Sequence, residues 1–280
     1  MKRSLIIISA CAIIAGFISC AKPSPVNITE LTADETTLKP EQTTVLHCLV
    51  DDTTGVTYSW SASLGTIEGL GDSAVWTAPE FLWTTAYDTV RIVATNAESL
   101  SDTASIELTV EVNFQSLDAN DDTYTLSIDS ASSFSTAQYI LVGYDPGWQG
   151  FFHAFIKFQD PVIPSGETFK RARIKLWREY SEGDNCNIAV YQITQDWQGV
   201  NVKPGSEPSS LYNTSYLDTA SQVGYLYFDI TSIVQNWRTG QPNNGIMLRA
   251  KEETVTAGRR DFKSREAEAS RRPALEVVSW

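Results

Sequence analysis

The sequence predicts an all-β protein made of two β-sandwiches in series. Short apolar segments with period-two alternation recur along the chain, as expected for strands that bury one face. Clusters of Asn, Gly and Pro separate these segments and mark turns. The 280 residues are too many for one small module and fit two domains of ordinary size.

The first residues have the pattern of a secretory signal. Lys2 and Arg3 form a basic start, and residues 5–17 are apolar apart from small residues. This apolar run is too short to span a membrane, so we interpret it as a cleaved signal peptide. An ordinary secretory signal and an uncleaved anchor are alternatives to the lipoprotein signal considered next.

Residues 17–20, Phe-Ile-Ser-Cys, resemble a bacterial lipobox in which Phe replaces the usual Leu. The resemblance implies a lipoprotein signal peptide over 1–19, lipid attachment at Cys20 and a short Pro/Ser-rich tether over 20–25. Several acyl chains hold a protein at a membrane far more stably than one. We therefore expect a bacterial cell-envelope protein, anchored by lipid at the outer membrane or cell surface, with the leaflet left open.

Composition excludes two classes of function. The chain carries a formal net charge of −13, and loss of Lys2 and Arg3 with the signal would make it more acidic. A chain this acidic is a poor nucleic-acid binder, so we expect no nucleic-acid partner. The sequence holds only two histidines, which leaves too few imidazoles for a zinc site.

Cysteine use is sparse. Cys11 lies in the signal, Cys20 is the predicted lipid site, and Cys48 and Cys186 fall in different predicted domains. A disulfide between the last two would require an intimate domain contact. We favour two buried, unreactive thiols.

The segment 26–112 alternates and is rich in β-branched residues. Leu46, Cys48 and Val50 form the more apolar face of one strand and should point inward. Trp60 and Trp76 are expected in the core rather than as ligand platforms.

This pattern resembles bacterial Ig-like and PKD-like domains, in which a Trp of the third strand fills the core. The resemblance implies an Ig-like sandwich over 26–112. The later strand offers Ile92 and Ala94 where a second cysteine would be needed, so we expect no disulfide within the domain. No group of residues in it suggests chemistry, and we interpret it as a spacer.

The last part of the chain carries the more specific signal. Four pieces follow one another in order: residues 228–237, 242–248, 261–266 and 272–277. Their order resembles the end of the DNRLRE (disaggregatase-related) domain, grouped with carbohydrate-binding module family ninety-six. The resemblance implies a jelly-roll-type sandwich over 120–280 that binds carbohydrate, after a linker at 113–119.

The middle of this domain departs from the pattern. The family often has a Trp, a run of Thr and a second Trp, whereas here Trp197 is followed by Gly199-Val200-Asn201-Val202-Lys203-Pro204. The role of Trp197 is left open. Trp237 is expected in the core, because the family motif uses that Trp structurally.

Cations oppose the apolar residues in four predicted strands. Since successive side chains of a strand point to opposite faces, these cations should share the solvent side of a sheet. The predicted ligand-binding residues are Lys157, Arg173, Lys175, Trp177, Arg249, Lys251, Lys263 and Arg265.

Such a surface suits an acidic, uronate-type polysaccharide. Arg meets carboxylates in bidentate geometry, Lys adds charge, and aromatic rings stack on sugar rings. The resembling family includes alginate binders, which points the same way. Each exposed contact is weak, so affinity requires a repeating polymer. The alternative is a plain solvated face whose cations are neutralised by the glutamates at 179, 252, 253, 266 and 268.

An acidic cluster opens the distal domain. Asp121 and Asp122, with Asp118 and Asp129 nearby, are candidate ligands of a structural Ca²⁺, and no cofactor is required. Their spacing matches no defined calcium loop, and we favour a solvated acidic junction.

Catalysis is not expected. His47 and His153 stand apart, and there is no nucleophile elbow and no phosphate-binding loop. The Gln-Ile-His motif of jelly-roll alginate lyases is absent. The sequence therefore predicts a non-catalytic lipoprotein that retains polysaccharide, with polysaccharide-degrading enzymes or transporters as partners. The alternative is an envelope structural or adhesion protein whose distal sandwich binds protein or cell-wall polymer.

Overall fold

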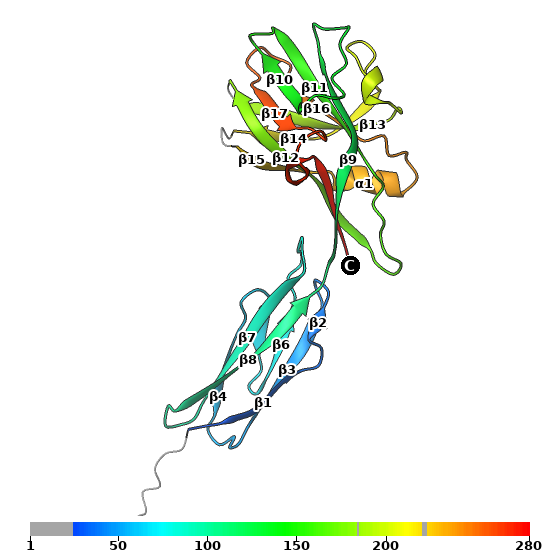
Figure 1. The fold of residues 1–280 in the computed structure, drawn as a ribbon. Helices are drawn as coiled ribbons and strands as arrows, with labels where there is room; N and C mark the ends of the chain where they lie inside the picture. Colours follow the sequence, from blue (N-terminus) through cyan, green and yellow to red (C-terminus); the bar gives the residue numbers. More distant parts are fainter. Residues whose placement is uncertain (1–24, 184, 220–222) are drawn as a thin grey trace, which may run out of the picture.

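A computed structural model of the chain describes residues 25–183, 185–219 and 223–280 (Figure 1). Strands dominate it, and the α-helix in these ranges is α1 (Thr231–Arg238), so the all-β prediction is confirmed. The predicted signal peptide, Cys20 and nearly all of the tether lie outside the described residues. Within the described ranges, no helix has the length and apolar character needed to cross a membrane.

The first domain is a sandwich of two four-stranded sheets. The order of the first sheet is β1 (Ile28–Ala33), β3 (Thr43–Val50), β6 (Ser73–Thr77) and β5 (Thr66–Gly69). The order of the second is β2 (Thr37–Leu38), β8 (Ser101–Val110), β7 (Ala86–Thr95) and β4 (Thr57–Ser61). β2 runs parallel to β8, and the other pairs are antiparallel.

The core of this domain follows the predicted alternation. Leu46 and Cys48 are buried, whereas Leu49 on the other face is exposed. Trp76 is fully buried, as predicted, and its Nε1 donates to Asp88 at 2.7 Å. Burial alone would raise the pKa of Asp88, but hydrogen bonds from Ser63, Gly65 and Trp76 outweigh it and lower that pKa. Trp60 is only half-buried at the edge of the core.

The second domain begins in a strand, not after a linker. β9 (Asn113–Leu126) starts where the linker 113–119 was expected, so that prediction is wrong. Residues 113–118 pair with β18 (Ala274–Ser279), and residues 119–126 pair with β11 (Gly150–Phe158). The first half of β9, residues 113–118, is mostly polar, and none of its side chains is fully buried, so its sequence lacks the apolar alternation of a buried strand.

The second domain is a sandwich of two sheets that share strands. The outer edge of the first, called sheet C, is β15 (Gly224–Asp229), which pairs with β12 (Phe169–Glu182). The other side of the long strand β12 pairs with β18 and, farther along, with β17 (Arg259–Lys263). Beyond these, β9 pairs with β18, and β10 (Tyr139–Asp145) pairs with β17. The second, called sheet D, runs from β9 through β11 and β16 (Ile246–Ala250) to β13 (Cys186–Ile193) and β14 (Ser210–Asp218).

β10 also belongs to both sheets. Its first residues pair with β17, and Gly143 to Asp145 pair with β11. Gly143 has φ +105°, and a Cβ there would lie 2.1 Å from the carbonyl oxygen of Gly258. Only glycine fits at this change of sheet.

Apolar side chains of both sheets fill the space between them. Ile174 and Leu176 of β12 meet residues such as Phe228 and Leu248, all almost fully buried. Trp237 of α1 joins the same core, which confirms its structural role.

An ion triad is buried inside this core. Arg178 Nη1 and Arg260 Nε each lie 2.6 Å from Asp218, and all three side chains are at most 3% exposed. Cys186 is buried beside them, and burial raises the pKa of its thiol to about 11. Cys48 and Cys186 are both buried and free, which confirms the thiol prediction.

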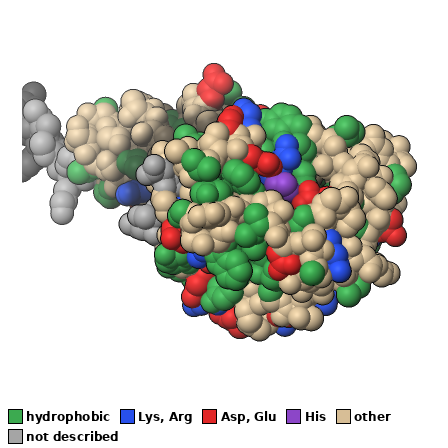
Figure 2. Space-filling model, turned by 90° about the horizontal axis from the view of Figure 1, so that it is seen from above, with side chains coloured by type: hydrophobic (Ala, Val, Ile, Leu, Met, Phe, Trp, Pro, Cys, Tyr) green, Lys and Arg blue, Asp and Glu red, His purple; other side chains and the backbone are tan. Residues whose placement is uncertain are grey.

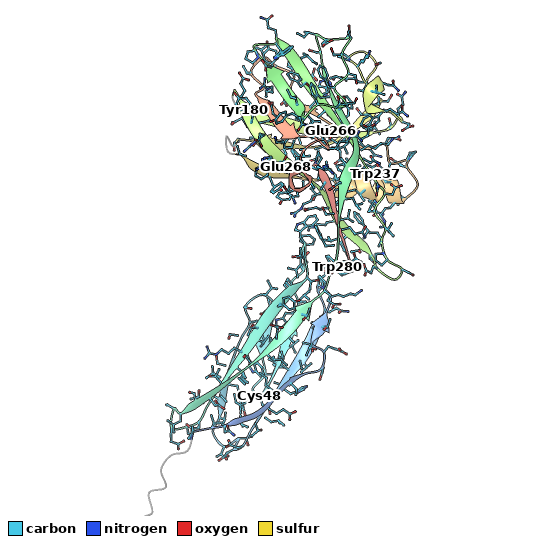
Figure 3. All side chains as sticks on the ribbon, in the orientation of Figure 1. Cys48, Tyr180, Trp237, Glu266, Glu268 and Trp280 are labelled. Carbon is cyan, nitrogen blue, oxygen red and sulfur yellow. The ribbon has the colours of Figure 1, made fainter. Side chains whose placement is uncertain are left out.

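The two domains touch through aromatic side chains. Phe81 and Trp83 lie between β6 and β7, and the guanidinium of Arg173 is 3.8 Å from the centre of the Trp83 ring. Arg171 lies 4.3 Å from the Phe81 ring, which also contacts Trp280 at 6.0 Å between centroids. Figure 3 shows Trp280 at the junction of the domains. The first domain thus packs against part of sheet C.

We expect Asp218→Ala to lower the free energy of unfolding by about 3–5 kcal/mol, because two buried guanidinium groups lose their counter-charge. Urea unfolding checks this, with Asp196→Ala as control, since Asp196 is 80% exposed in its pair with Lys157. A loss for Asp218→Ala no larger than that of the control would contradict the expectation.

Candidate functional site

The predicted cationic residues do not share one face. Arg173 and Lys175 of β12 and Lys263 of β17 lie on the outside of sheet C. Lys157 of β11 and Arg249 of β16 lie on the outside of sheet D. The expectation of one outward cationic plane is wrong, because the outer faces of two packed sheets point in opposite directions.

Two predicted residues lie beyond the strands. Lys251 follows β16 and is exposed. Arg265 follows β17, and its Nε lies 2.9 Å from Glu266. Arg265 also donates from Nη1 to the carbonyl oxygen of Asn120, at the middle of β9. The eight predicted residues therefore lie on the outer faces of both sheets and in the segments that follow β16 and β17.

The outer face of sheet C brings aromatic side chains into a row. Trp177 pairs with Tyr225 on β15, and Lys263 pairs with Tyr139 on β10. Arg178 pairs with Phe262, so the adjacent residues Trp177 and Lys263 are neighbours across the two strands. The side chains of Trp177 and Lys263 both contact Glu179. This aromatic row crosses four strands, and at about 4.8 Å per strand it is about 14 Å long.

Cations stand over the rings of the aromatic row. The ammonium of Lys175 is 4.4 Å from the centre of Tyr225, and that of Lys263 is 4.4 Å from the centre of Tyr139. The guanidinium of Arg271 lies 4.5 Å from the centre of Trp177. These cation–π contacts fix the cations beside the aromatic surface without neutralising them.

Carboxylates partly balance this charge. Glu179 accepts from Trp177 Nε1 at 2.7 Å and lies 3.5 Å from Arg271. Glu276, only 4% exposed, lies 2.6 Å from Arg173 and 3.6 Å from Lys175. Of the glutamates named from the sequence, those at 179, 253, 266 and 268 pair with cations, as the solvated-face alternative expected.

Arg173 belongs to the contact between the domains. Its guanidinium lies between the rings of Trp83, at 3.8 Å, and Tyr227, at 4.0 Å. With Glu276 beside it, the side chain is 22% exposed. Arg173 therefore contributes to the contact between the domains. The part of the outer face of sheet C that this contact leaves uncovered is the aromatic row.

The outer face of sheet D is largely covered. Phe155 and Met247 are buried with Trp197 beneath the segment between β13 and β14. Trp197 is 7% exposed and donates from Nε1 to the carbonyl oxygen of Asn244 at 2.7 Å. Its place is therefore in this small core, with one edge at the surface.

His153 joins two loops on this face. Its Nδ1 lies 3.0 Å from Glu207, and its Nε2 lies 2.8 Å from Glu253. Burial alone would lower the pKa of His153, but Glu207 and Glu253 outweigh it and raise that pKa. Figure 2 shows acidic and basic side chains interspersed over this end of the molecule. An anionic polymer meets no concentrated positive charge here.

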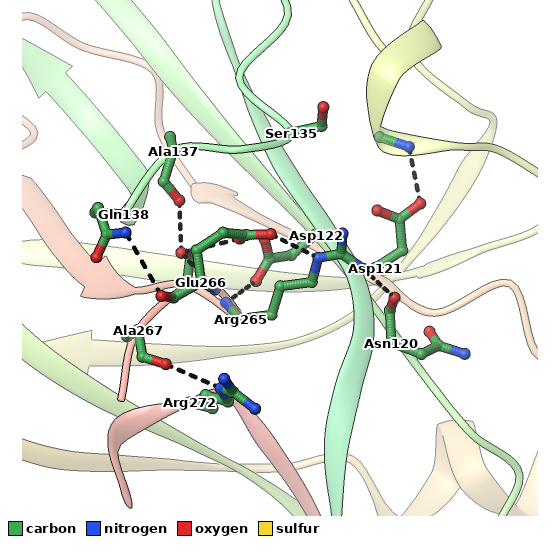
Figure 4. A network of polar contacts seen from close by, with 12 residues as sticks. Asn120, Asp121, Asp122, Ser135, Ala137, Gln138, Arg265, Glu266, Ala267 and Arg272 are labelled. Atoms are coloured by element: carbon green, nitrogen blue, oxygen red, sulfur yellow. Dashed lines mark hydrogen bonds and ion pairs between the residues drawn. The ribbon is translucent and has the colours of Figure 1, made fainter. Parts of the chain in front are cut away.

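The two aspartates proposed as calcium ligands point apart. Asp121 accepts from the backbone N–H of Gly199 at 2.9 Å, and buried Asp122 accepts from that of Arg265 at 2.7 Å (Figure 4). Successive residues of a strand face opposite ways, so these two carboxylates do not converge on one point. Across the described ranges, no group of three or more His, Cys, Asp or Glu residues could hold a metal ion.

The sequence prediction missed some residues on the outer face of sheet C. Tyr225 and Tyr227 alternate with buried Leu226 and Phe228, so the period-two pattern of β15 contained the signal. Arg271 lies outside the strands, in a 3₁₀ turn, and alternation says nothing about such a residue.

The distal domain is a two-sheet β-sandwich whose outer face on sheet C carries partly exposed aromatic rings among cations. The model of carbohydrate-binding module family 96 matches residues 113–279, which is more than half of the chain. The chain therefore belongs to this family, and its distal domain is a carbohydrate-binding module. The DNRLRE resemblance, the Ig-like resemblance and the lipoprotein signal stay predictions.

Two solved structures are similar to the chain at low scores. One is described as the structural basis for the promiscuous specificity of carbohydrate-binding modules from the β-sandwich superfamily; it has a TM-score of 0.26, 10% identity and coverage of 91% of this chain and 92% of that chain. The other is SGBP-B of a Bacteroides ovatus mixed-linkage glucan utilization locus, in complex with a mixed-linkage heptasaccharide, with a TM-score of 0.16, 12% identity and coverage of 90% and 73%. TM-scores this low do not establish a shared topology. No curated protein sequence matches the chain.

We expect the stability of the protein to fall as pH rises through the range in which Asp122 titrates. Burial raises the pKa of Asp122 from 3.8 to about 7, so the folded state holds a proton that the unfolded state has lost. Between these values the Asp122 carboxyl should lower the free energy of unfolding by up to about 1.4 kcal/mol per pH unit.

Asp122→Asn should remove this dependence while keeping an oxygen for the Arg265 N–H. Urea unfolding of both proteins between pH 4 and pH 8 tests it, and the variant should gain relative stability as pH rises. Parallel curves over this range would show that Asp122 is ionised in the folded protein.

Proposed function

We propose that the chain binds an acidic, uronate-type polysaccharide without catalysis, through the aromatic row on sheet C. The observation that carries the proposal is the register that brings Tyr225, Trp177, Lys263 and Tyr139 into one line. Family membership supports glycan binding, and the charged surroundings of this row support an anionic glycan.

The arrangement suits a chain of uronate units. Aromatic rings offer apolar surface to sugar rings, while Lys175 and Arg271 stand beside them, 26% and 38% exposed. Four cations, Arg173, Lys175, Lys263 and Arg271, contact three carboxylates, Glu179, Glu268 and Glu276. Each added contact with a sugar carboxylate is weak, so several units of a polymer must bind together.

The chemistry of the face supports binding rather than turnover. A general base needs a poised group within reach of the substrate. His153 lies on the other sheet, and glutamates engage both of its ring nitrogens. In the aromatic row, Lys263 contacts Tyr139 and Glu179, and the hydroxyl of Tyr225 donates to the carbonyl oxygen of Ser270.

One observation favours a second candidate function, adhesion to protein. β14 is the edge strand of sheet D, and it exposes Leu211, Tyr212, Tyr216 and Leu217, each at least 40% exposed. An exposed apolar edge strand is a site at which another chain can pair. A protein that shows no retention in any polysaccharide gel would favour this role.

We further propose that lipid on Cys20 holds the protein in the bacterial cell envelope, where it serves polysaccharide-degrading enzymes or transporters. Cys20→Ser should move the protein from the membrane fraction to the soluble fraction and abolish labelling by palmitate, because the thiol that accepts lipid is gone. Cys11→Ser is the matched control and should leave both unchanged. Equal labelling of the two variants would contradict the assignment.

Native gels containing polygalacturonate or alginate should retard the protein, whereas gels containing a neutral glucan should not. Lys175→Gln combined with Lys263→Gln should weaken uronate binding by up to about thirtyfold, because two charges worth up to about 1 kcal/mol each are lost. Added salt should weaken binding further, since exposed charges are screened.

Arg91→Gln is the control, because Arg91 lies in the first domain and on β7. Retention in uronate gels that neither the double variant nor salt reduces would refute the aromatic row as the site.

A further inference from the structure

We infer that a groove at the crossing of β9 is a second subsite for the same acidic polysaccharide. The groove has a volume of about 480 Å³ and is lined by Lys157, Arg265, Trp197, Gln198, Asn120 and Thr136, among others. Small-molecule sites have volumes of about 300–1,000 Å³. The inference rests on the proposed function and extends it to a place outside the aromatic row.

The crossing of β9 brings together cations from opposite sheets. Lys157 comes from β11 of sheet D, and Arg265 follows β17 of sheet C. Both line the same groove, because β9 leaves sheet C after residue 118 and enters sheet D. Two of the residues predicted as ligand-binding thus meet, although their sheets face apart.

The groove has the mixed lining that a sugar requires. The ammonium of Lys157 lies 5.9 Å from the centre of the Trp197 ring, which forms part of the wall. Asn120, Gln198 and Thr136 add amide and hydroxyl groups that can bond sugar hydroxyls. A uronate unit would place its carboxylate between the two cations.

The cations of the groove are accessible to a ligand. Lys157 pairs with Asp196 at 2.6 Å, but Asp196 is 80% exposed, so this pair is weak and easily exchanged. Arg265 uses Nε on Glu266 and Nη1 on the carbonyl oxygen of Asn120. Its Nη2 has no hydrogen-bond partner within the described part of the chain. Asp121, the carboxylate of the groove, already accepts from Gly199.

Close packing fixes the shape of the groove. A Cβ at Gly199 would lie 2.9 Å from Asp121 Oδ1 and 3.0 Å from both the Asp122 carbonyl oxygen and Ser135 Cβ. No side chain fits there, so the loop after Trp197 rests directly on β9. This loop is the segment in which the sequence departs from the Trp and Thr pattern of the resembling family. The groove is therefore a feature of this chain's own loop.

The test is calorimetric titration of the whole protein with a defined oligogalacturonate. Lys157→Gln combined with Arg265→Gln should weaken binding at least about fivefold. Asp196→Asn should strengthen it, by about twofold, because Lys157 loses its competing carboxylate. Lys203→Gln, in the same loop but not lining the groove, is the matched control and should change nothing.

Hydrogen exchange supplies a second readout, which does not depend on a variant that folds poorly. Bound oligogalacturonate should protect the backbone of residues 197–202 and 134–137. Wild-type protein that binds no uronate would refute the proposed function itself. Binding that Lys175→Gln and Lys263→Gln reduce, with no effect of the groove variants and no protection of these segments, would refute the groove alone.

Discussion

The arrangement of the distal domain depends on the backbone pairing of β9 with two sheets. One half of this strand bonds to β18 and the other half to β11, so the strand ties the sheets together along one edge (Figure 1). Because its side chains alternate, Asp122 enters the interior at the crossing while Asp121 meets the loop at Gly199. Lys157 of sheet D and Arg265, which follows sheet C, line one groove because β9 passes from one sheet to the other at this point.

Charged groups act differently inside and outside this sandwich. Arg178, Asp218 and Arg260 are shielded from water, so removal of one partner leaves uncompensated charge. On the outer face of sheet C, Lys175, Lys263 and Arg271 each lie over an aromatic ring and contact a carboxylate, and they stay partly exposed to water. The same residue types thus stabilise the core in one place and line an outer face in another.

The contact between the domains changes the interpretation of the first one. Trp83 covers Arg173, and Phe81 contacts Trp280, so the first domain occupies the part of sheet C next to the aromatic row. A spacer in the simple sense would leave that face open. Here the domain contact covers part of that face.

Alternation along β3 and β12 was sufficient to predict which side chains are buried, because burial in a strand follows from the period of two. It also placed Arg173, Lys175 and Trp177 on one outward face, and the late motifs indicated the carbohydrate-binding family. Alternation could not assign Lys157 and Lys263 to opposite sheets, because inward and outward are local properties whereas sheet membership depends on pairing between distant strands. The prediction of a linker at 113–119 failed for the same reason, since residues 113–118 of β9 pair with β18, more than a hundred residues away. The amino-acid order by itself determined the sandwich pattern and the chemistry of its surface. Only the tertiary structure decided which cations meet, because long-range hydrogen bonding and the close approach at Gly199 set their positions.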